Sequence, residues 1–256
     1  MKRSLSFFIP LCVLLLLSRQ EVSALSSFNI EKMPSLYRRT PLIHSAQLTE
    51  LVGKDIYLKL DALQPSGSFK DRGMAHLCET FQQKGVTQLI SSSGGNAGLA
   101  VATVGCLQLK MQVQVVVPKT TKQLVVQKLQ ALGADVTVTG ENWNEADAVA
   151  RQRVADSNGR AEYVSPYDNP LLWTGHSTVV DEILEDLPNV GCIVVSVGGG
   201  GLICGVLEGL SKASSSSGTK SKVKVIAAET EGASSFVQAF AKGEVVTLPG
   251  KRTSMF

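Results

Sequence analysis

One lysine in a glycine- and serine-rich turn is the side chain of this sequence best placed to do chemistry. Lys70 follows the turn-forming run Pro65–Phe69 and stands at the start of a predicted helix, residues 70–84. A lysine on a helix is normally a solvated surface cation. Behind a turn and beside the ring of Phe69, however, the amine of Lys70 can be desolvated, which lowers its pKa. A neutral amine can attack a carbonyl group or accept a proton as a base.

Two glycine-rich segments provide candidate sites for anions. Residues 91–98 read SSSGGNAG, and residues 198–201 are four glycines followed by Leu202. Each segment lies between a predicted strand and a predicted helix, where backbone N–H groups and the helix dipole favour an anion. Consecutive glycines also let the backbone come close to a phosphate. An activated amine and two anion-binding turns match the needs of pyridoxal 5′-phosphate (PLP), a cofactor with an aldehyde and a phosphate.

The spacing of the glycines and the lysine separates these segments from other common sites. Lys70 does not follow glycines at P-loop spacing, and the run at 198–201 lacks the Gly-x-Gly-x-x-Gly pattern of a dinucleotide site. Gly67 stands where the serine of a Ser-x-x-Lys motif would be. Residues 91–98 taken alone are also compatible with an ordinary strand-to-helix turn that has a serine N-cap.

Composition and charge exclude several other classes of protein. The chain has 256 residues, 44% of them hydrophobic and 18% charged, which is enough for a large buried core. A net charge of +3 without a basic, aromatic patch argues against nucleic acid as a partner. The five cysteines and three histidines show no zinc spacing. Unpaired thiols in apolar segments are typical of a reducing compartment, so we expect a cytoplasmic protein.

The first 24 residues have the form of a secretory signal peptide. Lys2 and Arg3 precede the apolar stretch Leu5–Leu17, and a small-x-small pattern follows at residues 22–24. The apolar stretch is short for a membrane span, so no stable membrane association is expected. The alternative is that these apolar residues do not target the protein to any compartment. A secretory destination therefore stays open beside the cytoplasmic one, and residues 1–24 carry no weight for the fold.

Strands and helices are predicted to alternate from residue 55 onward. The predicted strands are 56–60, 88–90, 113–117, 136–138, 192–197 and 223–228. The predicted helices are 70–84, 96–109, 122–132, 144–156, 178–187, 202–210 and 234–242, and the serine-rich run 211–222 is expected to be a solvated loop. This order predicts an α/β fold with a mainly parallel sheet covered on both faces, whose ligands bind beyond the carboxyl ends of the strands.

Together the three motifs resemble the L-serine/L-threonine dehydratases, specifically the serine dehydratase group of the fold-type II PLP enzymes. The resemblance runs from about residue 40 to residue 249. It is carried by LQPSGSFK at 63–70, SSGGNAG at 92–98, GGGGL at 198–202, and by AET at 228–230 with Gly232–Ala233.

The resemblance implies two open, doubly wound domains like those of the tryptophan synthase β subunit, with PLP between them. The smaller domain would span residues 65–165, and the larger one would combine residues 35–64 with 166–256. Family members continue for further strands and helices, so the larger domain is expected to be truncated and to expose apolar faces. The family also implies a homodimer.

Roles follow from the resemblance, residue by residue. Lys70 would form the Schiff base and serve as the base, with Phe69 stacked on the pyridine ring. Asn96 would bond the ring 3-oxygen and, with Ser93, Gly94 and Gly95, receive the substrate carboxylate. Either the cofactor phosphate or Ser93 would help protonate the departing hydroxyl. The phosphate would be held by Gly198, Gly199, Gly200, Gly201 and Leu202.

A cation site is also implied. Glu229, with the carbonyl groups of Gly198 and Ala233, resembles the ligands of a monovalent cation, K⁺ being the expected one. The structural alternative for Glu229 is an exposed charge at the end of a strand.

The implied reaction is an elimination that converts L-serine to pyruvate and ammonia, and L-threonine to 2-oxobutanoate and ammonia. The segment Asp71–Met74 looks more like threonine synthase, so this activity stays open, as do racemisation and a cysteine synthase-like replacement. A hypothesis of another class is a non-catalytic, truncated isoform that binds PLP weakly or dimerises with a full-length form.

Overall fold

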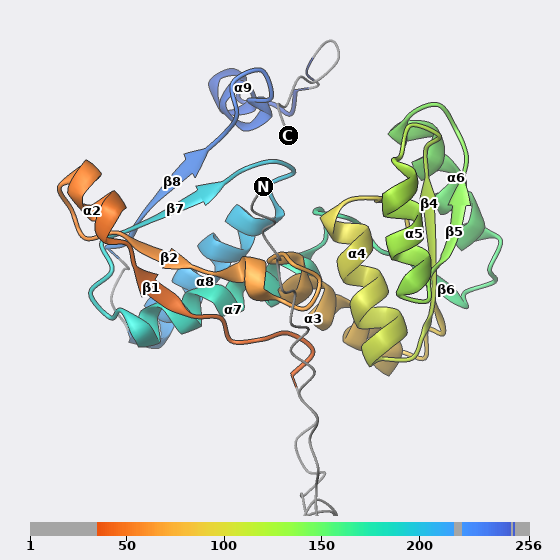
Figure 1. Cartoon of the computed structure of the whole chain (residues 1–256), viewed down its shortest axis with the longest axis horizontal. Coiled ribbons are helices and arrows are strands. Elements are labelled where there is room, and N and C mark those ends of the chain that lie inside the picture. Colours follow the sequence, from red (N-terminus) through yellow and green to blue (C-terminus); the bar gives the residue numbers. More distant parts are fainter. Residues whose placement is uncertain (1–34, 218–221, 247, 249–256) are drawn as a thin grey trace, which may run out of the picture. The chain divides into compact units, whose positions relative to one another are not determined.

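The computed structural model describes residues 35–217, 222–246 and 248 (Figure 1). The described residues from Leu36 onward belong to one compact unit. The signal-peptide-like segment 1–24 and residues 249–256 lie outside the described residues. The expected division into a small domain, 65–165, and a larger domain, 35–64 with 166–256, stays a prediction.

A four-stranded parallel sheet lies at the centre of residues 86–164. Its strands run in the order β5-β4-β3-β6, and every neighbouring pair is parallel. The strands are β3 (Gln88–Ser91), β4 (Gln112–Val117), β5 (Asp135–Val138) and β6 (Ala161–Tyr163). The parallel, buried strands confirm the α/β class that the alternation predicts.

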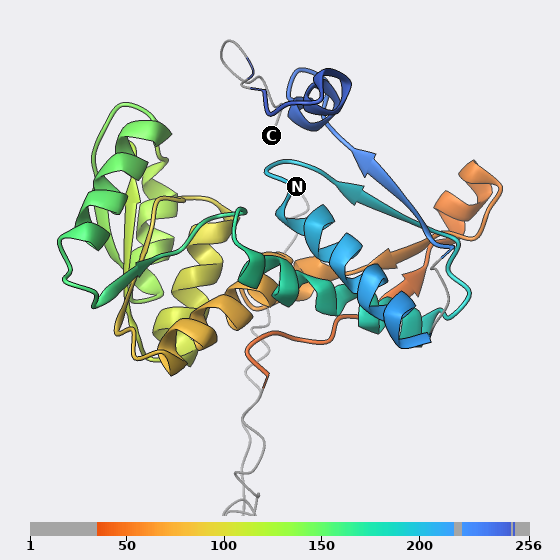
Figure 2. The ribbon, with the colours of Figure 1, turned by 180° about the vertical axis from the view of Figure 1, so that it is seen from behind.

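Helices cover both faces of this sheet. Successive strand residues point to opposite faces, so Val115 and Val117 join the core formed with α3 (Lys70–Gln83), α4 (Asn96–Ala102) and α5 (Gln123–Ala131). Val116, one residue away, packs instead against Ala146 and Ala150 of α6 (Trp143–Ala155). The views from opposite sides show α4 and α6 on either side of the strands (Figures 1 and 2).

Two smaller sheets lie elsewhere in the unit. Strands β1 (Leu42–His44) and β2 (Tyr57–Lys59) are antiparallel and flank α2 (Ala46–Val52). The short helix η1 (Asp61–Leu63) follows β2. Strands β7 (Cys192–Ser196) and β8 (Lys224–Ala228) are parallel, and α9 (Ser235–Lys242) follows them.

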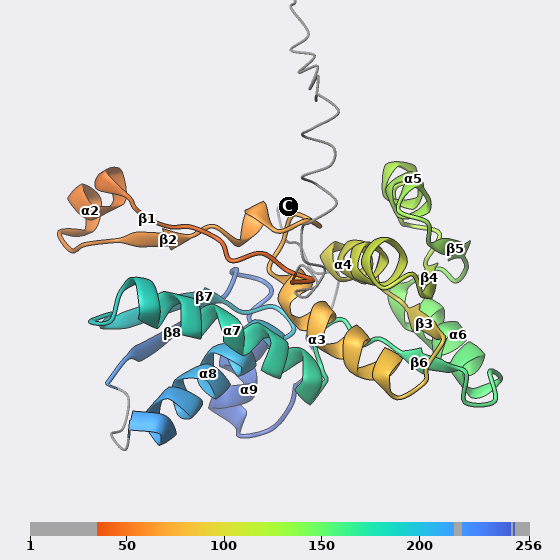
Figure 3. The same cartoon turned by 90° about the horizontal axis from the view of Figure 1, so that it is seen from below.

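Three helices cross closely with glycines at their contacts: α3, α7 (Pro170–Asp186) and α8 (Gly201–Ser217) (Figure 3). A Cβ atom on Gly175 of α7 would lie 2.4 Å from the carbonyl oxygen of Arg72 in α3. A Cβ on Gly205 of α8 would lie 2.4 Å from Cβ of His176. Real side chains do not come this close, so glycine is what lets α7 pack closely against both α3 and α8.

The helices differ from the sequence prediction at two places. The serine-rich run is not a loop from residue 211, because α8 continues to Ser217. The serine hydroxyls bond back to carbonyl groups one turn earlier, as in Ser214 Oγ to Leu210 O at 2.8 Å and Ser216 Oγ to Lys212 O at 3.0 Å, so the run is compatible with a helix. Helix α7 begins at Pro170 rather than 178, with Asn169 as its N-cap.

One stretch departs from ordinary helix geometry. The predicted helix 96–109 is α-helical only through Ala102 and continues as a π-helix over Thr103–Gln108. In residues 35–217 and 222–246, no helix is long and apolar enough to cross a membrane.

Candidate active site

Lys70 is the first residue of α3 and its amine is largely buried. Gly67, at φ +87° in the left-handed region, turns the chain just before the helix. The amine donates a hydrogen bond to the carbonyl oxygen of Pro166 and lies 5.1 Å from the centre of the Phe69 ring. Burial lowers the pKa of Lys70 to about 8, so a far larger fraction of the amine is neutral near physiological pH than in an exposed lysine.

Arg72, one residue beyond Asp71 on the same helix, anchors the start of α3. The Arg72 side chain is fully buried and binds both oxygens of two carboxylates: Asp61 at 2.7 and 2.9 Å, and Glu182 at 2.6 and 2.9 Å. Burial opposes the charges, but these hydrogen bonds outweigh it and lower the pKa of both Asp61 and Glu182. The network ties α3 to η1 and α7.

The turn after β3 is held by the two residues that precede it, Ser91 and Ser92. Ser91 Oγ donates to the carbonyl oxygen of Val164 at 3.2 Å, and Ser92 Oγ lies 2.9 Å from the Tyr163 hydroxyl. The turn also needs glycine at its end, since a Cβ on Gly98 would lie 1.7 Å from the carbonyl oxygen of Ser93. These constraints direct residues 93–96 away from the sheet, and Gly95 and Asn96 are exposed.

The glycine run joins β7 to α8. Gly200 has φ +83°, a conformation that strongly favours glycine. A Cβ on Gly199 would lie 2.5 Å from Cγ of Tyr167, and one on Gly201 would lie 2.8 Å from the Tyr167 carbonyl oxygen. Gly198 and Gly200 face open space, because a Cβ built on either residue would have no other atom within 4 Å.

All three motifs therefore meet one segment, Tyr163–Tyr167, at the carboxyl end of β6. The amine of Lys70 bonds Pro166, the turn after β3 bonds Tyr163 and Val164, and the glycine run packs on Tyr167. Sequence reasoning did not single out this segment. Its residue types are ordinary, and its position depends on β6 lying next to β3 in the sheet.

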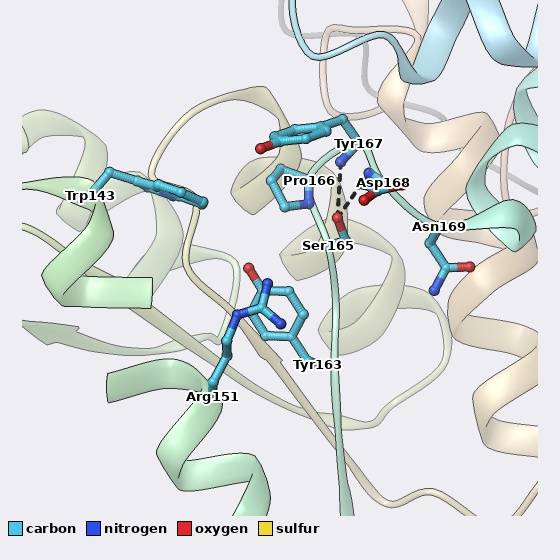
Figure 4. A pocket seen from close by; sticks show the side chains of 8 residues that line it. All are labelled: Trp143, Arg151, Tyr163, Ser165, Pro166, Tyr167, Asp168 and Asn169. Carbon is cyan, nitrogen blue, oxygen red and sulfur yellow. Dashed lines mark hydrogen bonds between the residues drawn. The ribbon is translucent and has the colours of Figure 1, made fainter. Parts of the chain in front are cut away.

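A pocket of about 220 Å³ opens beside this segment (Figure 4). It is lined by Trp143, Arg151, Tyr163, Ser165, Pro166, Tyr167, Asp168 and Asn169. Ser165 fixes the backbone that forms the wall, because its hydroxyl accepts hydrogen bonds from the N–H groups of Tyr167 and Asp168 at 3.4 and 2.9 Å. The pocket wall and the partner of Lys70 are therefore parts of one segment.

Phe69 packs edge-on against a buried histidine. The rings of Phe69 and His176 lie 5.1 Å apart at 63°, and His176 is fully buried. Burial, then the nearby charges of Lys70 and Arg72, lower the pKa of His176 to about 3, so the imidazole is neutral at physiological pH. This packing fixes the ring that the sequence places against a cofactor.

Two further predicted residues, Asn96 and Glu229, belong to other elements than Lys70. Asn96 is the first residue of α4 and is exposed. Glu229 follows β8, where its two carboxylate oxygens accept hydrogen bonds from the N–H groups of Phe236 and Val237, both at 2.8 Å. It thus binds the N-terminal turn of α9. In the part of the chain that the structure describes, no group of three His, Cys, Asp or Glu side chains is arranged to hold a metal.

A family model described as pyridoxal-phosphate dependent enzyme matches residues 34–255. The chain belongs to the pyridoxal-phosphate dependent enzyme family. It is 44% identical over 216 residues to an L-serine dehydratase/L-threonine deaminase of Mus musculus, covering 84% of this chain and 64% of the relative. An L-serine dehydratase of Saccharomyces cerevisiae is 40% identical, covering 83% of this chain and 66% of the relative. The chain thus spans a little under two thirds of these curated relatives.

Solved structures agree with this membership. The chain superposes on a fungal L-serine ammonia-lyase from Rhizomucor miehei with a TM-score of 0.76 and 36% identity, covering 86% of this chain and 68% of the other. It is also similar to a maize serine racemase, with a TM-score of 0.75 and 25% identity over 84% of this chain and 63% of the other. The shared fold is the α/β fold of fold-type II PLP enzymes.

The residues of this PLP enzyme family member fit the cofactor. The buried Lys70 amine suits an aldehyde, because its lowered pKa leaves it available as a nucleophile. The open space before Gly198 and Gly200, followed by the first N–H groups of α8, suits a phosphate. Phe69, held by His176, offers an aromatic surface beside the amine.

Proposed function

We propose that this protein deaminates L-serine, and L-threonine, by PLP-dependent β-elimination, giving pyruvate or 2-oxobutanoate and ammonia. The observation that carries the proposal is the bond between the Lys70 amine and the one segment that also meets both glycine-rich turns. The names of the mouse, yeast and fungal relatives support the same substrates.

The residues divide into three binding functions. Lys70 would bind the cofactor aldehyde, with Phe69 against the ring and Asn96 at the ring oxygen. The run Gly198–Gly201 with Leu202 would hold the phosphate. The turn Ser93–Asn96 would receive the substrate carboxylate, whose negative charge suits N–H groups at the start of α4.

The side chains of Lys70 and Ser93 would carry out the proton transfers. When bound, PLP supplies an electron sink for the negative charge that develops at the substrate Cα. The neutral amine of Lys70 accepts the Cα proton, for which a pKa of about 8 is well matched near physiological pH. The Ser93 hydroxyl lies in the turn that holds the carboxylate and can protonate the departing hydroxyl. The proposed overall reaction releases one pyruvate and one ammonia from each L-serine.

Four further features belong to the proposal. The fold consists of two doubly wound domains, residues 65–165 and residues 35–64 with 166–256. K⁺ binds at Glu229 with the carbonyls of Gly198 and Ala233; each Glu229 oxygen accepts one hydrogen bond and keeps a further lone pair. The protein is a homodimer. It is cytoplasmic, which the unpaired thiols Cys78, Cys106, Cys192 and Cys204 support.

The decisive assay supplies PLP and L-serine to the purified protein and measures pyruvate. We expect pyruvate from the wild-type chain and none from Lys70→Ala. Folded, PLP-loaded wild-type protein that makes no pyruvate would favour the non-catalytic isoform. Threonine released from O-phosphohomoserine would instead indicate threonine synthase. The Asp71–Met74 segment weighs little for that activity, because Arg72 is committed to the buried pairs with Asp61 and Glu182.

A further inference from the structure

A partly buried polar cluster lies beneath the turn that we assign to the substrate carboxylate. It contains Ser92 directly after β3, Asp147 and Arg151 of α6, and Tyr163 of β6. Ser92 is fully buried and Asp147 is 9% exposed. Figure 4 shows Tyr163 and Arg151, whose side chains lie together at the lower edge of the pocket.

Asp147 is the centre of this cluster. One of its oxygens, Oδ1, accepts hydrogen bonds from Ser92 Oγ at 2.7 Å and from the Tyr163 hydroxyl. The other, Oδ2, accepts from Arg151 Nε at 2.8 Å, one helical turn later. The Arg151 guanidinium also lies 4.0 Å from the centre of the Tyr163 ring, a cation–π contact that fixes the ring.

The charges of the cluster are defined at physiological pH. Burial opposes ionisation of Asp147, but the hydrogen bonds from Tyr163, Ser92 and Arg151 outweigh it and lower the pKa of Asp147. Burial, then Asp147 itself, raise the pKa of Tyr163 to about 12. The cluster therefore holds a carboxylate, a neutral phenol and a guanidinium, and the carboxylate keeps both hydroxyl groups oriented.

This arrangement acts on the residue just before Ser93. The Ser92 hydroxyl donates to Asp147, and the Ser91 hydroxyl donates to the carbonyl oxygen of Val164, so both residues that precede the turn have fixed side chains. The backbone of the turn therefore starts from a fixed position, and this fixes the directions of its N–H groups. A carboxylate beneath an anion site would repel its ligand, and Arg151 offsets that charge by pairing with Asp147.

Packing alone does not require this cluster. Its immediate neighbours are apolar, since Ala146 and Ala150 flank Asp147 on α6 and pack with Ile90 and Val116. An apolar side chain of similar size would extend that core. The pair between Asp147 and Arg151 adds little stability, because the Arg151 side chain is 59% exposed and solvent screens its charge. We propose that Asp147 is a positioning residue that acts through Ser92 to hold the turn Ser93–Asn96 in the geometry that binds the substrate carboxylate. This inference rests on the proposed function.

The test compares Asp147→Asn with Asp156→Asn. Both changes replace a carboxylate by an amide on α6 or its C-cap, but Asp156 is exposed and bonds only the Gln152 side chain among the described side chains. The probes are L-alanine, which lacks a leaving group, and L-alaninamide, which also lacks the carboxylate. Their dissociation constants are measured on PLP-loaded protein from the change in cofactor absorbance.

We expect Asp147→Asn to weaken L-alanine binding about 10-fold and to change L-alaninamide binding less than about 2-fold. Asp156→Asn should change neither. Tyr163→Phe removes one of the two hydroxyl donors to Asp147. It should weaken L-alanine binding about 3-fold without a comparable change in L-alaninamide binding, and it replaces Asp147→Asn in the test if that variant does not fold. Equal weakening of both probes would assign Asp147 a purely structural role and overturn the proposal.

A second measurement does not depend on the enzymatic activity. Amide hydrogen exchange of the PLP-free protein should be at least about 10-fold faster at residues 93–96 in Asp147→Asn, with unchanged exchange in α5. Wild-type exchange at 93–96 would overturn the positioning role. If exchange at 93–96 is faster in Asp147→Asn but the wild-type protein does not bind L-alanine, the proposed function is overturned. The role of Asp147 in fixing the turn would still stand in that case.

Discussion

The amine of Lys70 donates a hydrogen bond to the backbone carbonyl oxygen of Pro166, a residue 96 positions later in the chain. The bond connects the first residue of α3 to the segment that follows β6. Because that same segment bonds the turn after β3 and packs on the glycine run, the geometry of the candidate site depends on Tyr163–Tyr167 as much as on the three motifs themselves.

Lys70→Met should stabilise the cofactor-free protein at neutral pH and lose this advantage in alkali. Burial lowers the pKa of Lys70 to about 8, whereas an unfolded lysine titrates near 10.4. Between these values the unfolded chain binds more protons, so wild-type stability rises with pH. Urea unfolding should show a gain of about 1–3 kcal/mol at neutral pH that shrinks towards pH ~10.5. An equal gain at both pH values would contradict a Lys70 pKa lowered by burial.

Gly199→Ala should destabilise the protein through Tyr167. The new Cβ would lie 2.5 Å from Cγ of that ring, at the base of a side chain that cannot swing clear. We expect a loss of about 1–3 kcal/mol in the free energy of unfolding. In a Tyr167→Gly background, which also removes the Tyr167 Cβ that would lie 2.9 Å from the new atom, the same change should cost less than about 0.5 kcal/mol. An equal loss of unfolding free energy in both backgrounds would contradict the contact between Gly199 and Tyr167.

Arg72→Met should be strongly destabilising, because it leaves the carboxylates of Asp61 and Glu182 buried without their partner. The expected loss is about 3–5 kcal/mol near neutral pH. The native pKa values of Asp61 and Glu182 are lowered, so the wild type loses stability as pH falls through them, and the gap to the variant should narrow in acid.

The control for Arg72→Met is Arg39→Met. Arg39 pairs with Glu185 and Asp186 on the surface, where its side chain is 51% exposed. Solvent screening makes such pairs weak, so this variant should unfold like the wild type. If urea unfolding showed a similar loss of unfolding free energy for both variants, the buried ion pairs of Arg72 would contribute no more to stability than the surface pairs of Arg39.

The outer face of the β7–β8 pair should be an exposed apolar surface. Val194 and Ile226 are directly paired across the two strands and are 66% and 51% exposed, whereas neighbouring Val195 is 5% exposed. Val194→Thr should change stability by less than about 0.5 kcal/mol and lower the binding of a hydrophobic fluorescent dye. Val195→Thr should cost about 1–2 kcal/mol. Reversed effects would mean that the two faces are exchanged.

Local sequence signals were sufficient for the motifs and for most elements around them. The helix at Lys70 and the helices after both glycine turns were predicted, because turn residues and apolar spacing act over a few residues. The start of α7 was missed although its signal is present: Asn169 caps the helix and Pro170 occupies its first turn. The serine-rich end of α8 was missed because serine can satisfy its hydroxyl within a helix.

The contacts that assemble the site could not be predicted in this way. Asp147, Tyr163 and Pro166 belong to no motif, and their proximity to the functional turns follows from the strand order β5-β4-β3-β6. Arg72 reads as part of a charged segment, yet it is fully buried because Asp61 and Glu182 arrive from distant parts of the chain. Periodicity in the sequence does not encode such pairings.

The central claim is that the amine of Lys70 is the group that binds the cofactor aldehyde. The most direct test is borohydride reduction of the PLP-loaded protein, followed by mass mapping of its peptides. We expect one pyridoxyl adduct per chain, on the peptide that contains Lys70, and no adduct at that level in Lys70→Ala. Adducts spread over exposed lysines such as Lys119, in equal amount in both proteins, would contradict the claim.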